Sequence, residues 1–439
     1  MPRAILHISI LIFAILSTNT VSTLLVAGPI WLVCFFAAIR NKNQNFDIID
    51  LFWLLYSLSY FAAPAQRLAE PDNSFLFDKG GLMRMSFGRY LNYEADQIYL
   101  LYLLFFIVAL INFLILPKTV PQFRSKELKF NLPFWGFATL LLMSFLFEVF
   151  LKGGFSNVMA GRRFKEAGVG GIYTMLVICH TLAICFLFAT KIRSYSNAKK
   201  IAALFLIFTV LGVLYNPFNS ARFFLIQAYL PILLILVPKF RKFSVLAPLL
   251  IFGMFVLMPL LSLTTRQGLG ADFSEFSLAE SSPLGYLDQH VVLLHLLEYV
   301  RVNGYAYGSS ITGVLLFFVP RAFWVAKPVV LGLVIGGDLY QGGFAGTDNL
   351  SGPIVGDLYY DFGVLGVLIG SVAVAYFFRF FVRISARVNN IDVVRFILLA
   401  SLPILFRGTV GAVLPLVSFT LIYVYLYLFA ANNVKWSLK

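Results

Sequence analysis

Charge is what this sequence has least of. Only 12% of its 439 residues are Asp, Glu, Lys or Arg, whereas 60% are hydrophobic, and soluble globular chains carry roughly 25% charged residues. So little charge excludes a water-soluble fold, because one core cannot hide that much apolar surface. Apolar runs of about 20 residues, the length that crosses a bilayer, recur from end to end. The sequence therefore predicts an all-α polytopic membrane protein, with residues 1–439 forming a single domain in the lipid bilayer.

Cysteine and nucleotide-binding motifs are also scarce. The three cysteines lie in apolar runs and lack CxxC spacing, which argues against a disulfide framework and against a zinc site. No Asp-x-Asp motif occurs in the loops, and no pattern of strands and glycines suits a nucleotide phosphate. The net charge of +14 is spread over short loops, so it indicates membrane topology rather than nucleic acid. We expect no metal, no cofactor and no nucleic-acid partner.

Apolar runs bounded by charged residues, Pro and Gly predict about twelve transmembrane helices. They are expected at 4–17, 21–39, 48–64, 97–116, 131–151, 172–190, 201–215, 222–237, 244–262, 353–378, 391–408 and 412–431. The first run follows Met-Pro-Arg, as in a signal peptide. No small-x-small cleavage site comes after it, so we expect a retained helix.

Basic residues predict the orientation of these helices. One alternating set of loops holds 19 Lys and Arg residues, and the other set holds 14 in roughly two and a half times as many positions. The denser set is cytoplasmic by the positive-inside rule, so both termini are predicted to face the cytoplasm. Three longer segments then lie outside: 65–96, a basic loop at 152–171 and a large loop at 263–352. A loop as long as the last usually carries function.

Ionisable residues inside the predicted spans gather near one side. Asp50 lies within one turn of a cytoplasmic end and is expected to reach water there. Five others lie near non-cytoplasmic ends, namely Glu148, Arg222, Asp357, Asp361 and Arg407. Charges inside a membrane are costly and often functional.

Two interpretations of these charges stay open. They form ion pairs that tie helices together, or they line an outward-facing cationic cleft with Arg162 and Arg163 of the basic loop. Such a cleft suits a diphosphate, because guanidinium groups bind its oxygens bidentately and stay charged.

The large outer loop contains two shorter predicted elements. Residues 288–303 have apolar positions at helical spacing beside His290 and Arg301, which predicts an amphipathic helix at the interface. His290 is a candidate general base because imidazole titrates near neutrality, and His295 is a weaker one. Residues 308–328 hold an apolar run too short to cross, which predicts a re-entrant or interfacial piece that presents Arg321 and Lys327.

Two motifs in the large loop and the following span resemble those of a known family. The first is a short apolar run that ends in Pro320-Arg321, followed by Trp324 and Lys327-Pro328. The second leads into a late span with Tyr359, Phe362-Gly363 and Gly366. Together they resemble the bacterial oligosaccharide repeat unit polymerases, also called O-antigen polymerases of the Wzy type. The family often has Glu where this sequence has Asp357, which is a shorter acid.

The resemblance implies a fold and an activity. It implies a GT-C-like membrane glycosyltransferase of the bacterial inner membrane that acts in lipopolysaccharide biosynthesis. The polymerase transfers a growing glycan from undecaprenyl diphosphate to a new lipid-linked repeat unit, and a chain-length regulator is a possible partner. Arg162, Arg163, Arg222, Arg321, Lys327 and Arg407 would bind the diphosphate. His290, Asp357 or Glu148 would act as base, and Trp324, Tyr359 and Tyr360 would contact sugars.

Other functions fit the same architecture. An O-antigen ligase would use the same donor and deliver the glycan to lipid A core. A flippase or secondary transporter would have a similar number of spans, but charges at the membrane midplane and an internal repeat, both typical of transporters, are not evident. A non-catalytic scaffold would not explain arginines placed at one depth.

Overall fold

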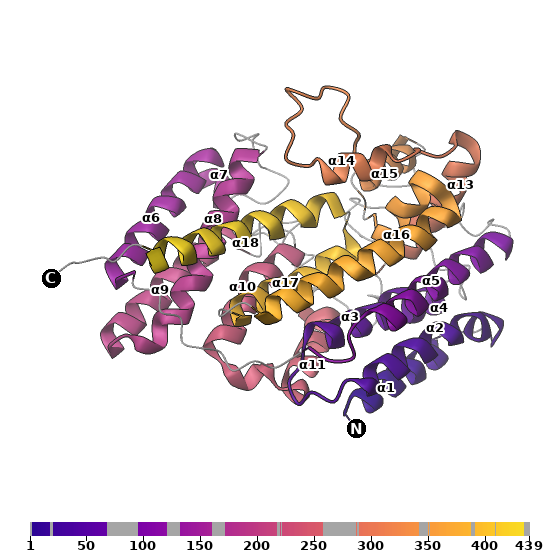
Figure 1. Ribbon diagram of the computed structural model, residues 1–439, viewed down its shortest axis with the longest axis horizontal. Coiled ribbons are helices and arrows are strands. Elements are labelled where there is room, and N and C mark those ends of the chain that lie inside the picture. The colour runs from indigo at the N-terminus through magenta and orange to yellow at the C-terminus, as the bar shows by residue number, and fades with distance from the viewer. Residues whose placement is uncertain are drawn as a thin grey trace, which may run out of the picture. The chain divides into compact units, whose positions relative to one another are not determined.

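The computed structural model describes most of the chain and is helical throughout the described residues (Figure 1). The described residues are 2–17, 21–67, 95–120, 132–159, 172–216, 220, 222–257, 287, 289–341, 350, 352–387, 391–408 and 410–433. A helix is present at each of the twelve positions where the sequence predicts a span. The amphipathic helix predicted at 288–303 is also present, as α13 (Gln289–Asn303).

The helices form two compact units. One comprises Met1–Val120, Ser282–Ile384 and Leu402–Val413. Its helices are α1 (Pro2–Ser17), α2 (Val21–Arg40), α3 (Ile48–Ser57), the π-helix η1 (Leu58–Ala62), α4 (Ala63–Arg67), α5 (Ala95–Ile115), α13, α14 (Ser309–Leu315), α15 (Leu331–Gln341) and α16 (Ile354–Arg387). We call this the loop-bearing unit, because it contains the described part of the large loop predicted at 263–352.

The second unit comprises Pro121–Ser281, Ser385–Ser401 and Leu414–Lys439. Its helices are α6 (Phe134–Leu151), α7 (Phe155–Met159), α8 (Ile172–Lys191), η3 (Ile192–Ser194), α9 (Asn197–Leu214), α10 (Arg222–Leu236), η4 (Pro238–Arg241), α11 (Phe243–Phe252) and η5 (Gly253–Leu257). The bounds of α17 (Ile391–Arg407) and α18 (Val410–Asn433) run across both units.

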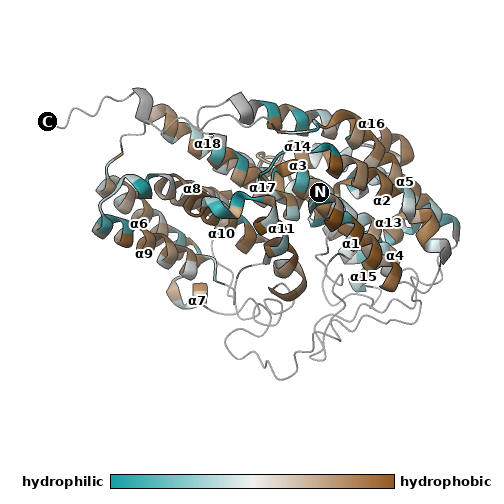
Figure 2. Ribbon diagram, turned by 90° about the horizontal axis from the view of Figure 1, so that it is seen from below, coloured by the Kyte–Doolittle hydropathy of each residue, from teal (hydrophilic) through white to brown (hydrophobic). Residues whose placement is uncertain are grey.

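The helices have the surfaces of membrane spans. Eight described helical segments are long and apolar enough to cross a bilayer, and three shorter ones are also apolar. Large apolar side chains such as Trp135, Phe150 and Phe205 are exposed, and apolar residues make up much of the length of the helices (Figure 2). In water such patches would drive aggregation, whereas lipid solvates them. The chain is therefore a multi-pass membrane protein, and the number of twelve crossings stays a prediction.

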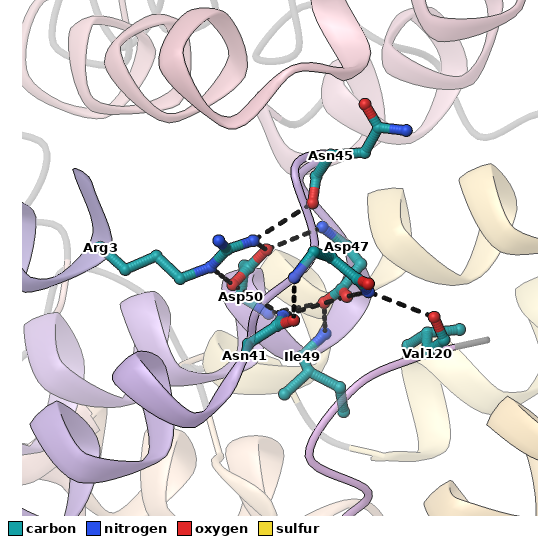
Figure 3. A network of polar contacts seen from close by, with 8 residues as sticks. Arg3, Asn41, Asn45, Asp47, Ile49, Asp50 and Val120 are labelled. Atoms are coloured by element: carbon teal, nitrogen blue, oxygen red, sulfur yellow. Dashed lines mark hydrogen bonds and ion pairs between the residues drawn. The ribbon is translucent and has the colours of Figure 1, made fainter. Parts of the chain in front are cut away.

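A buried polar network fixes the start of the central helix α3 in the loop-bearing unit (Figure 3). Arg3 donates from Nε to Asp50 Oδ1 at 2.5 Å and from Nη2 to Oδ2 at 2.7 Å. Asp47 caps the helix by accepting from the backbone of Ile49 and Asp50, and Asp50 accepts from the backbone N–H of Asp47 in return. Asp50 therefore does not reach water as the sequence suggested, because Arg3 pairs with it inside the protein.

The long helix α16 is two helices joined at a sharp kink. Phe362 and Gly363 leave helical geometry, and Gly363 has φ +61°, a conformation that glycine adopts without steric cost. A Cβ atom on Gly366 would lie 2.2 Å from the carbonyl oxygen of Leu358, and one on Gly370 would lie 2.2 Å from Leu358 Cδ2. In a straight helix Leu358 and Gly366 would be roughly 12 Å apart along the axis. The short first half, Ile354–Asp361, therefore packs closely against the second half.

The close packing around Leu358 predicts a sharp effect of one methyl group. Gly366→Ala would place Cβ against a backbone oxygen that cannot move aside, so we expect a loss of about 3 kcal/mol or more in stability. Gly212→Ala in α9 is the matched control, because nothing lies within 4 Å of its Cβ position. Thermal unfolding of both variants in detergent tests the prediction, and equal midpoints would refute the packing of the two halves.

Candidate functional site

The first half of α16 holds the short helix α14 through two carboxylates. Asp361 Oδ1 accepts from the backbone N–H of Ser310 at 3.1 Å, and Oδ2 accepts from that of Ile311 at 2.7 Å. Asp357 Oδ1 accepts from the hydroxyl of Ser310 at 3.3 Å. Both acids are buried. Asp361 thus caps the N-terminus of α14, where a negative charge is favourable, and Asp357 lies against the same turn.

The chain after α14 is folded into a compact turn by Lys327. Its ammonium donates to the carbonyl oxygens of Leu316, Phe317 and Val319 at 3.2, 2.9 and 2.9 Å. Burial, and then the nearby charge of Arg321, lowers the pKa of Lys327 from its ordinary value. The predicted re-entrant piece is therefore a short helix closed by a lysine. Lys327, expected to bind diphosphate, donates here to three backbone carbonyls, and its role toward diphosphate stays a prediction.

Arg321 is presented at the surface of this turn. Its Nη1 donates to the carbonyl of Lys327 at 2.8 Å, and the side chain is otherwise exposed. Trp324 lies half-buried in the same turn, between the exposed residues Phe323 and Val325. Arg321, which the sequence predicted as a binding cation, is thus anchored by one hydrogen bond to the backbone, and the side chain stays exposed to solvent.

Tyrosines cluster beside the kink of α16. Tyr305 contacts Tyr307 and Tyr359 in edge-to-face geometry, with ring centroids 6.3 Å apart in both pairs. Tyr299 contacts Tyr360 in the same way at 6.2 Å. Tyr305 also lies so close to Gly363 that a Cβ there would be 2.9 Å from its hydroxyl.

The chain brings these tyrosines together from α13, the loop before α14, and α16. Tyr359 is buried and Tyr360 half-buried, whereas Tyr305 and Tyr307 are exposed. Sequence reasoning identified the two tyrosines of α16 and missed the other three. The run Gly304-Tyr305-Ala306-Tyr307-Gly308 was the available signal.

The two histidines of α13 have different environments. His290 is fully buried, with 0% of its surface exposed. His295 Nε2 lies 2.7 Å from Oδ2 of Asp338 on α15. The sequence favoured His290 as the base, and that role stays a prediction for a side chain that lies in the core. Asp338 was not singled out, since nothing in the sequence placed α15 beside α13.

Glu148 lies in the second unit, in a saturated polar cluster. Its carboxylate accepts from Lys152 at 2.6 Å, from Thr181 at 3.0 Å and from Tyr215 at 3.4 Å. The carboxylate is 0% exposed. This arrangement matches the interpretation in which embedded charges tie helices together, and the role of Glu148 as a base stays a prediction.

The remaining candidates are described only in part. Arg162 and Arg163 lie outside the described residues, and of Arg222 only the backbone, at the start of α10, is described. Arg407 ends α17 in the loop-bearing unit and is half-buried. Glu148 and Arg222 belong to the second unit, whereas Asp357, Asp361 and Arg407 belong to the loop-bearing unit. A single cleft that unites all five stays a prediction.

The candidate site therefore consists of residues of the loop-bearing unit alone. It combines an exposed guanidinium at one end of α14 with a tyrosine cluster at the other end, and α14 itself is roughly 10 Å long. Within the described residues, no three His, Cys, Asp or Glu side chains gather so that they could hold a metal ion. Because guanidinium groups bind anions and tyrosine rings offer an apolar face, these two features favour a ligand that has both an anionic group and a ring.

Removing the ammonium of Lys327 should open the turn that carries Arg321. Lys327→Met leaves three carbonyls without their charged donor, so we expect trypsin to cleave after Arg321 several times faster than in the wild type. Lys42→Met, at an exposed lysine, is the control. Mass spectrometry of the fragments gives the rates, and an unchanged rate at Arg321 would contradict the role of Lys327.

No protein-family model, curated protein or solved structure matches this chain.

Proposed function

We propose that this protein is a polymerase of bacterial surface polysaccharide that joins lipid-linked oligosaccharide repeat units outside the cytoplasm. One observation carries the proposal: in the loop-bearing unit, α14 lies along the chain between a cluster of tyrosines, which includes Tyr305 and Tyr359, and the turn that presents the exposed Arg321. Arginine matches the oxygens of a diphosphate, and tyrosine faces stack on sugar rings. The resemblance of 304–370 to repeat unit polymerases, in the motifs around Arg321 and Gly363, supports the same activity.

The proposed chemistry needs no nucleotide sugar. The donor glycan is attached to a polyprenyl diphosphate, and an acceptor hydroxyl attacks its anomeric carbon while the diphosphate departs. Arg321, with Arg163, Arg222 and Arg407 as further candidates, stabilises the negative charge that grows on the leaving group. Tyr359 and Tyr360, with Trp324, orient the sugars. The acids Asp357 and Asp361 position α14, and thereby the arginine that follows it.

Deletion of the gene in its host separates the proposed function from the alternatives. A polymerase predicts surface glycans capped at one repeat unit, because single units are still exported and ligated. A flippase predicts the loss of all lipid-linked glycan outside, and a ligase predicts full-length glycan that is not attached to lipid A. Either of the last two results would refute the proposal.

Single substitutions test the diphosphate site in the complemented deletion strain. Arg321→Ala and Arg163→Ala should abolish chain extension, with loss of about 100-fold or more, because each removes a cation that acts on the leaving group. Arg193→Ala, in a predicted cytoplasmic loop, should extend chains normally. Glycan length on gels, at equal amounts of membrane-inserted protein, is the measurement. Wild-type lengths in both site variants would refute the diphosphate site.

A further inference from the structure

The pairing of His295 with Asp338 links two helices of the large outer loop. The two side chains come from α13 and α15, with Nε2 2.7 Å from Oδ2. The side chain of His295 is 13% exposed and that of Asp338 is 47% exposed. The pair therefore lies at the surface of the loop-bearing unit, with the ring largely covered and the carboxylate open to water.

The contact fixes how the imidazole is protonated. An ionised carboxylate only accepts hydrogen bonds, so Nε2 of His295 carries a proton toward Asp338. In the neutral ring Nδ1 is then the basic atom. A carboxylate in this position holds the ring in one tautomer and stabilises the imidazolium that forms when Nδ1 takes a proton.

The pair lies one helical turn from the tyrosine cluster. His295 and Tyr299 are four residues apart, which places them on the same face of α13 and roughly 6 Å apart along its axis. The Tyr299 ring contacts Tyr360 of α16 at 6.2 Å. A sugar stacked on these tyrosines would therefore bring its hydroxyl groups close to the imidazole of His295.

Two other charged groups on α13, Arg301 and Glu298, pair with each other, and the charge of His295 also acts on Glu298. Arg301 donates to Glu298 at 2.6 Å, and Gln97 on α5 donates to Glu298 at 3.0 Å. The bond from Arg301 keeps the pKa of Glu298 below its ordinary value. The further titratable groups on elements packed against α13 are Asp96, Tyr99 and Tyr102 on α5, Tyr60 in η1, Asp338 and Tyr340 on α15, and Asp357, Tyr359, Tyr360 and Asp361 on the first half of α16.

We propose that His295, oriented by Asp338, is the general base for the acceptor in the transfer reaction proposed above, on which this inference rests. His295 Nδ1 takes the proton of the acceptor hydroxyl as its oxygen bonds to the anomeric carbon. The bond from that carbon to the diphosphate oxygen breaks, and its electron pair leaves with the polyprenyl diphosphate. The imidazolium, paired with Asp338, then returns its proton to water. His295 is the catalytic residue, and Asp338 is a positioning residue.

The test uses the purified full-length protein in lipid nanodiscs. Lipid-linked repeat units extracted from the deletion strain serve as both donor and acceptor, and chain growth is followed on gels from pH 5 to pH 9. Wild-type activity should fall at low pH as the base becomes protonated. His295→Gln should lower the rate about 100-fold or more and abolish this fall. Asp338→Asn should lower the rate less and change the shape of the acid limb.

Controls separate catalysis from structure. Lys42→Met, at an exposed lysine that precedes α3, should keep the wild-type rate and pH profile. Added imidazole should restore part of the activity of His295→Ala but none of that of Arg321→Ala. If His295→Gln does not fold, the Asp338→Asn variant provides the test. An unchanged rate and an unchanged pH profile in that variant would overturn the inference.

The two proposals fail in different ways. If the wild-type protein extends chains and the His295 and Asp338 variants extend them equally well, His295 is not the general base. The proposal that the protein is a polymerase would still stand. If the wild-type protein does not extend chains, the proposed polymerase function is refuted, and the proposed role of His295 is refuted with it.

Discussion

The candidate site depends on one close approach, that of Leu358 to Gly366 and Gly370 within α16. Two helix segments can meet at this distance only where the second has no side chains, since a Cβ would come within 2.2 Å of the first. The positive φ of Gly363 reverses the chain just before the contact. A membrane span that would otherwise run straight therefore begins with a short helix packed against it.

The rest of the site follows from that packed segment. Because the first half of α16 is fixed, Asp361 and Asp357 meet the N-terminus of α14, and Tyr359 and Tyr360 meet the tyrosines of α13 and the loop before α14. Lys327 then closes the chain behind α14 and leaves Arg321 exposed. Asp361 accepts hydrogen bonds from the backbone at the start of α14, and Lys327 donates to the backbone carbonyls of the turn after it. These bonds explain how irregular backbone is stabilised beside apolar spans.

The helices could be predicted from sequence, because an apolar run of about 20 residues has few alternatives to a membrane helix. The short helix after Gly308 was also predictable, since its apolar run is too short to cross. The kink was not, because Gly363, Gly366 and Gly370 indicate close packing without naming the partner. Asp50 and Lys327 show the same limit: the sequence singled out both charges, but their partners, Arg3 and three carbonyls, come from distant or irregular segments.

The candidate site was predicted in part for a similar reason. Arg321, Tyr359 and Tyr360 lie in motifs that can be recognised locally. The pairing of His295 with Asp338 depends on how α13 packs on α15, which no local pattern specifies. His290 seemed the better base from its place on an amphipathic helix, and only the packing places it in the core.

Chain growth from purified components tests the central claim most directly. The protein in nanodiscs would receive lipid-linked repeat units as the sole source of sugar, without nucleotide sugar. The account predicts a ladder of products that differ by one repeat unit, with one polyprenyl diphosphate released for each linkage formed. Repeat units that stay single, or that transfer only when lipid A core is added, would contradict it.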